Sequence, residues 1–186
     1  MVTPLFPRVR RQRGASMIEV LVTIVILVIG LLGLAGLQAR LQSSEMEAYQ
    51  RAQALVLLSD MASRIATNRV NAASYVTTTP LGVGMACPTG TSTPQQVDAG
   101  QWCNALQGAA ETSSGNKVGA MVGGRGCVEG LGSGEYLVTV AWQGLTPISA
   151  PPSSVTCGQN LYNGSHCTED RCRRAITTVV RIGDLT

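Results

Sequence analysis

The sequence predicts an α+β protein in which one long N-terminal helix packs on a small antiparallel β-sheet with disulfide-stapled loops. An apolar run near the N-terminus continues into a stretch without glycine or proline. Two segments near the C-terminus alternate apolar and polar residues, and all six cysteines follow residue 86. The 186 residues are enough for one domain of ordinary size, or for one domain plus an appendage.

The apolar run covers residues 20–37, reads VLVTIVILVIGLLGLAGL and contains no charge. Its 18 residues are about the shortest helix that can cross a bilayer, so the run predicts a membrane-spanning helix. Only Arg40 follows it closely, whereas four arginines precede it: Arg8, Arg10, Arg11 and Arg13. This asymmetry predicts a cytoplasmic N-terminus, with residues from 40 onward on the other side of the membrane.

Residues 38–70 contain no glycine or proline and have apolar side chains at three- and four-residue steps. These side chains are Leu41, Ala48, Ala52, Leu55, Leu58, Ala62 and Ile65. Joined to the apolar run, the segment predicts one helix from about Met17 to Arg69 whose second half lies against a globular head. Gly30, Gly33 and Gly36 are its weak points, and they either pack closely against neighbouring helices or permit local unwinding.

The head is predicted to be rich in β-structure. Residues 71–134 contain 13 of the 21 glycines, so we expect a long connecting region with short strands such as 118–122 and a turn at Gly123-Gly124. Residues 135–142, EYLVTVAW, alternate in polarity and predict the clearest strand. Residues 175–182, AITTVVRI, predict a second strand close to the C-terminus.

The cysteines predict disulfides formed in an oxidising compartment. They are Cys87, Cys103, Cys127, Cys157, Cys167 and Cys172. Their number is even, they form no C-x-x-C pair, and a single histidine cannot complete a zinc site of two cysteines and two histidines. Three precede the strand at 135–142 and three follow it. If all six pair, at least one bridge therefore joins the two groups, and the pairing is otherwise open among 15 possibilities.

No group of residues predicts an enzyme, a cofactor or a metal site. The only histidine, His166, lies beside a cysteine in a polar loop, and a Ser-His-Asp triad would need it. The charged cluster around Glu169-Asp170 predicts a turn before the last strand, and it includes Arg171, Arg173 and Arg174. We expect Trp102 and Trp142 in the core. Without the four N-terminal arginines, ten basic residues face eleven acidic ones, which argues against nucleic-acid binding.

Glu19 is the unusual residue of the N-terminal segment. It stands at the edge of the apolar run, where an ionised carboxylate in lipid costs several kcal/mol unless it is paired. We therefore expect it to have a functional partner. The alternative is a carboxylate that reaches the membrane interface and stays hydrated.

Residues 13–22, RGASMIEVLV, resemble the class III signal of type IV pilins and pseudopilins. The shared features are a short basic leader, a glycine and an apolar helix whose fifth residue is glutamate. The resemblance implies a type IV pilin-like fold, cleavage between Gly14 and Ala15 by prepilin peptidase, and N-methylation of Ala15, where the family usually has phenylalanine. It also implies that Glu19 sets the register of assembly by accepting the α-amino group of a neighbouring chain.

On this basis we divide the chain into a cleaved leader, 1–14, a transmembrane and fibre-packing helix, 15–37, an amphipathic helical half, 38–70, and a globular head, 71–186. The segments VTVAWQGL and CRRAITTVVRI also resemble the PilV group of minor pilins. That resemblance implies a subunit that primes or caps pilus assembly with other minor and major pilins and a tip adhesin, supporting twitching motility and surface attachment.

The same resemblance implies a bacterial inner-membrane protein that crosses once, has a periplasmic head and moves to the pilus on the cell surface. Two alternatives remain open. One is a minor pseudopilin of a type II secretion system, which shares the signal. The other is a secreted or membrane-anchored disulfide-rich binding domain, although the apolar run is long for a signal peptide and no good small-x-small cleavage site follows it.

Overall fold

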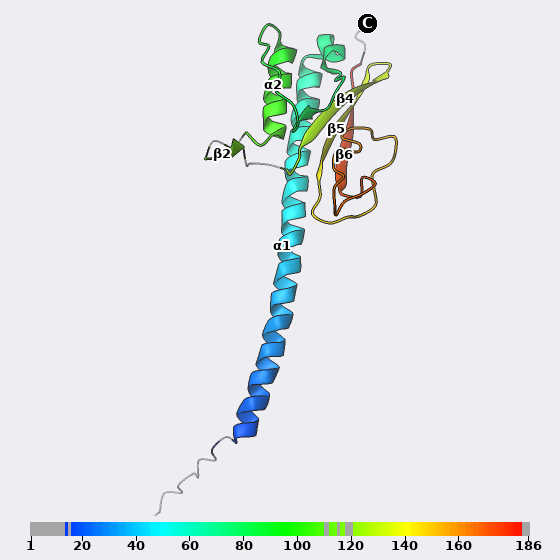
Figure 1. Cartoon of the computed structure of the whole chain (residues 1–186). Helices are drawn as coiled ribbons and strands as arrows, with labels where there is room; N and C mark the ends of the chain where they lie inside the picture. The colour runs from blue at the N-terminus through cyan, green and yellow to red at the C-terminus, as the bar shows by residue number, and fades with distance from the viewer. Residues whose placement is uncertain (1–13, 15, 110–111, 115, 118–120, 184–186) are drawn as a thin grey trace, which may run out of the picture. The chain divides into compact units, whose positions relative to one another are not determined.

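A computed structural model describes residues 14, 16–109, 112–114, 116–117 and 121–183 (Figure 1). The chain divides into two compact units, Met1–Gln42 and Ser43–Thr186. Helix α1, Met17–Thr67, begins in the first unit and ends in the second, which confirms the long N-terminal helix. It is followed by a 3-10 helix, η1, Arg69–Tyr75.

In the first unit, α1 exposes its apolar side chains. The large hydrophobic residues from Met17 to Leu41 are each about half exposed or more, and helix α1 contains an 18-residue window apolar enough to span a membrane, none of it buried. Gly30, Gly33 and Gly36 lie within the helix, and a Cβ at any of them would meet no atom within 4 Å. The helix is therefore not unwound at these glycines.

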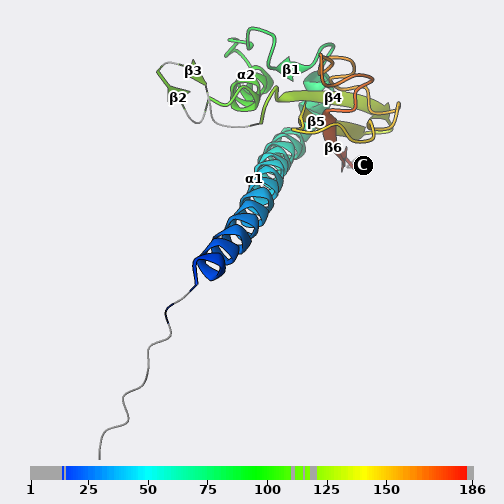
Figure 2. The same cartoon turned by 60° about the horizontal axis from the view of Figure 1, so that its bottom comes forward.

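The second unit is built on a four-stranded antiparallel sheet in the order β1-β4-β5-β6. Its strands are β1, Leu81–Gly82, β4, Arg125–Gly132, β5, Glu135–Gln143, and β6, Arg173–Arg181. Figure 2 shows β4, β5 and β6 side by side. The last two confirm the strands predicted at 135–142 and 175–182. A separate two-stranded ribbon is formed by β2, Thr112–Ser113, and β3, Asn116–Lys117.

The region before β4 differs from the prediction. It contains a helix, α2, Pro94–Leu106, which starts where Thr93 Oγ1 accepts a hydrogen bond from Gln96 N at 3.3 Å. The strand expected at 118–122 is not supported: residues 118–120 lie outside the described part of the chain, and 121–122 precede β4 without strand structure. The turn at Gly123 is confirmed, with a φ of 66° that favours glycine.

The face of α1 that packs on the sheet also differs from the predicted one. Its buried residues are Gln50, Ala54, Leu58, Met61 and Ile65. Leu58 and Ile65 were predicted and Ala62 is half-buried, but four other predicted core positions are exposed: Leu41, Ala48, Ala52 and Leu55. At 3.6 residues per turn these four lie about a third of a turn from the buried stripe. Because alanine and leucine occur on both faces, periodicity alone selected the wrong one.

Trp102 joins three elements at the centre of the core. Its side chain is fully buried, and its indole N–H donates to the carbonyl of Leu57 in α1 at 2.9 Å. The ring lies against Gly126 of β4, where a Cβ would overlap a carbon of the indole ring. Trp142 is also buried, so both tryptophans belong to the core as predicted.

The close approach of Trp102 to Gly126 predicts that Gly126→Ala lowers the free energy of unfolding by about 2 to 3 kcal/mol, because the added methyl overlaps the indole. Urea unfolding followed by tryptophan fluorescence measures the change. Gly130→Ala is the matched control in the same strand, since its Cβ would lie at an ordinary 3.6 Å from Val76. We expect it to change stability by less than about 1 kcal/mol. Equal effects of the two substitutions would contradict the prediction.

Candidate assembly site

The N-terminal end of α1 holds the residues that the sequence singled out. Gly14 is exposed, and a Cβ there would meet no atom within 4 Å. Ala15 lies outside the described residues, so cleavage between Gly14 and Ala15 and methylation of Ala15 stay predictions. What the structure describes in detail is the helix start that follows them.

Ser16 caps this helix start. Its side-chain oxygen accepts a hydrogen bond from Glu19 N at 3.3 Å, and its carbonyl accepts from the same N–H at 3.0 Å. Ser16-Met17-Ile18-Glu19 thus has the spacing of a capping box, and a carboxylate in the first turn also interacts favourably with the helix dipole. Both bonds are made by the Glu19 backbone N–H, so the Glu19 carboxylate contributes to the start of α1 through its charge and not through a hydrogen bond. This contribution was not predicted, although the S-x-x-E spacing indicates it.

The carboxylate of Glu19 makes no ion pair or hydrogen bond with any residue that the structure describes. Thr23 is the other polar side chain between Glu19 and Leu37, and it donates to the carbonyl of Val20 at 2.8 Å. The polar side chain within the apolar run thus has a hydrogen-bond partner, whereas the carboxylate of Glu19 at the edge of the run has none among the described residues. Both carboxylate oxygens of Glu19 are therefore available to a cation of another molecule.

The disulfides of the head pair neighbours in the fold. They are Cys87–Cys103, Cys127–Cys157 and Cys167–Cys172. The second joins the group before β5 to the group after it, which agrees with the bridge predicted to cross. No cluster of three or more His, Cys, Asp and Glu side chains placed to hold a metal occurs among the described residues.

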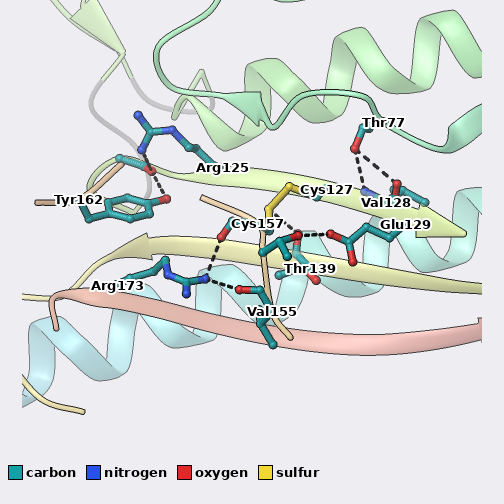
Figure 3. Close-up of a disulfide and its surroundings, with 12 residues drawn as sticks. Thr77, Arg125, Cys127, Val128, Glu129, Thr139, Val155, Cys157, Tyr162 and Arg173 are labelled. Atoms are coloured by element: carbon teal, nitrogen blue, oxygen red, sulfur yellow. Dashed lines mark hydrogen bonds between the residues drawn. A yellow bond between two sulfur atoms is a disulfide. The ribbon is translucent and has the colours of Figure 1, made fainter. Parts of the chain in front are cut away.

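The loop between β5 and β6 is fixed to the sheet around the Cys127–Cys157 bridge (Figure 3). Arg173 Nη1 donates to the carbonyls of Val155 at 2.7 Å and Cys157 at 3.1 Å. Its Nε lies 3.2 Å from Asp170 Oδ2, and both residues are buried. The expectation of a simple charged turn was therefore wrong for Arg173, which is a buried anchor rather than a surface charge.

Tyr162 anchors the same loop at a second place. Its hydroxyl donates to the carbonyl of Gly123 at 2.9 Å, and the guanidinium of Arg125 lies 4.9 Å from the ring centroid (Figure 3). Burial raises the pKa of the Tyr162 phenol. Thr156 also donates to Glu129 of β4 at 2.6 Å. These contacts fix the loop to the sheet, and His166 lies on the exposed surface of the loop.

A family model of the prokaryotic N-terminal methylation motif matches residues 9–35. The chain carries a prepilin-type signal. No curated protein and no solved structure matches it significantly. The matched segment contains Gly14, Glu19 and most of the apolar run, so the motif supports a type IV pilin or pseudopilin subunit that is processed by prepilin peptidase and assembles with other pilins.

The three bridges close loops of different length, which predicts unequal contributions to stability. Cys127 and Cys157 are separated by 30 residues, whereas Cys167 and Cys172 are separated by 5. From loop-closure entropy, the double substitution Cys127→Ala, Cys157→Ala should lower the free energy of unfolding by about 4 kcal/mol, and Cys167→Ala, Cys172→Ala by about 2 kcal/mol. Non-reducing urea unfolding of each variant tests the order, and a larger loss for the short loop would contradict it.

Proposed function

We propose that this protein is a minor pilin of a type IV pilus, a structural and not a catalytic subunit that helps to prime or cap pilus assembly. The observation that carries the proposal is Glu19, a carboxylate without a partner among the described residues at the start of an exposed apolar helix, within a prepilin-type motif. The likeness of the C-terminal segments to the PilV group supports the choice of a minor pilin.

In this proposal, assembly follows from the chemistry of the N-terminal segment. Prepilin peptidase removes the leader with its four arginines and leaves the apolar helix, which an ordinary secretory signal would lose. The helix then leaves the inner membrane laterally and packs in a fibre. Glu19 accepts the new N-terminal amine of a neighbouring chain, and a wrong register is disfavoured because it leaves a charge buried and unpaired.

In this proposal, the head lies outside the inner membrane, first in the periplasm and then on the pilus. Its disulfides suit an oxidising compartment, and the loop between β5 and β6, which is anchored to the sheet, offers a surface to other pilins or a tip adhesin. Twitching motility and surface attachment are the activities that such a pilus supports. The prepilin-type motif equally favours a minor pseudopilin of type II secretion as the second candidate.

The first test is processing at Gly14. Gly14→Val is expected to block cleavage, because the family's peptidase reads a basic leader that ends in glycine before the apolar helix. Intact mass of membrane-extracted protein shows whether residues 1–14 are removed. Gly30→Ala is the control, since a methyl there meets no atom within 4 Å and lies away from the cleavage point. A wild-type chain that keeps Met1, or that is cut after Ala39, overturns the pilin proposal.

The second test separates membrane insertion from assembly at Glu19. Glu19→Ala should leave insertion intact and reduce the ratio of protein in sheared fibres to protein in membranes by about tenfold or more, because a neighbour's amine loses its buried acceptor. Glu45→Ala is the matched control, an exposed glutamate on the same helix beyond the apolar run. An unchanged ratio for Glu19→Ala, or an equal drop for both variants, contradicts the pairing role.

A further inference from the structure

Strand β6 forms an outer edge of the sheet. It pairs with β5 at every position from Glu135–Arg181 to Gln143–Arg173 without a bulge. Hydrogen bonds at its two ends, from Ile182 N to Gly134 O and from Gly144 N to Cys172 O, direct the backbone groups of even-numbered residues toward β5. The N–H and C=O groups of odd-numbered residues therefore point away from the sheet.

These outward groups belong to Ala175, Thr177, Val179 and Arg181. Within the described part of the chain, nothing hydrogen-bonds to them. Natural edge strands are usually kept from pairing by shortness, a proline, a bulge or inserted charges. The other edge, β1, has only two residues, but β6 has nine, and its segment 175–180, AITTVV, contains no charge, proline or glycine. Strand β6 is thus an unprotected edge.

A groove of about 460 Å³ runs beside this edge, between α1 and β6. Its lining includes Glu47, Ala48 and Arg51 from α1 and Trp142, Arg174 and Ile176 from the two last strands. Ile176 is only partly buried although it points to the core face of the sheet, because the groove opens over it. A strand added to β6 would direct every second side chain to this same face.

The groove contains more positive than negative side chains. Glu47 Oε1 lies 3.1 Å from Arg174 Nη2 and also accepts a hydrogen bond from Leu145 N at 3.2 Å. Arg51, one helical turn further along α1, makes no ion pair or hydrogen bond with any described residue. The groove therefore has one cation that its own glutamate does not neutralise.

We propose that β6 and the adjoining groove form a docking site for a β-strand of another protein. The incoming segment extends the sheet through the outward groups of β6, places alternate apolar side chains in the groove, and meets Arg51 with an acidic side chain on that same face. A second copy of β6 fits less well, because antiparallel pairing about Thr177 sets Arg173 opposite Arg181 at both ends. This inference does not depend on the kind of fibre proposed above.

The test uses the full chain, ¹⁵N-labelled in detergent micelles, and the nine-residue peptide TVTVTETVT as a probe strand. Amide hydrogen exchange should be fast at Ala175, Thr177 and Val179 in the free protein and should slow at least tenfold when the peptide is added. Ile176 and Thr178 should exchange slowly throughout. Two further peptides are N-methylated at alternate residues, so that each loses the amide donors along one edge. Only the peptide that keeps its amide donors on the edge facing β6 should bind.

Two variants distinguish strand addition to β6 from non-specific binding of the peptide. Thr177→Pro removes one outward donor without breaking a bond to β5 and should abolish binding. Arg51→Glu should weaken binding of the acidic peptide about tenfold. Arg69→Glu, an exposed arginine in η1, is its control and should change the affinity less than twofold.

Slow exchange at the odd-numbered amides before peptide is added would overturn the proposal, since the edge would already be covered. Self-association of the protein through β6 would also overturn it in favour of a second copy as the occupant. Peptide binding that is unchanged by both Thr177→Pro and Arg51→Glu would place the peptide elsewhere.

Discussion

The contact of Trp102 with Gly126 is the constraint on which the arrangement of the head depends. An indole laid directly on strand backbone brings α2 against β4, and its N–H holds the carbonyl of Leu57 so that α1 is drawn to the same place. Arg64 of α1 also links the two helices, because it donates a hydrogen bond to Asp98 of α2 at 2.6 Å. The helix that enters the head is thereby bound both to the sheet and to the helix beside it.

Local patterns were sufficient to predict the extents of α1, β5 and β6: α1 lacks proline and is apolar or periodic along its length, and the two strands alternate in polarity. They did not predict burial, since β5 is buried on both faces from Val138 to Trp142. They did not predict α2, whose composition resembles that of the surrounding loops. The local signal was present in Thr93 and Pro94, a capping residue followed by a proline suited to the first helical turn. The buried face of α1 depended on tertiary packing, since Gln50 is buried and Leu55 is exposed, against their intrinsic preferences.

The candidate assembly site could be predicted from the sequence more fully than the contacts that fix the loop between β5 and β6 to the sheet. Gly14 and Glu19 are recognised by local spacing, and local spacing is what the sequence displays. Arg173 could not be recognised in this way, because its partners, the carbonyls of Val155 and Cys157, come from a loop whose path only the folded chain determines. The same holds for disulfide pairing: parity required one crossing bridge but did not identify Cys127 and Cys157.

The three disulfides also determine how the chain would respond to a pulling force. A load applied between the two ends of an oxidised chain cannot straighten the segments that the bridges close, which span 16, 30 and 5 residues. Each such residue withholds roughly 3.5 Å of extension. The Cys127–Cys157 bridge prevents the most extension, because it closes the longest segment. That segment contains β5, so tension passes through the covalent bond and not through that strand. Oxidised protein should therefore be a short, stiff mechanical element, whereas reduced protein should be a longer and softer one.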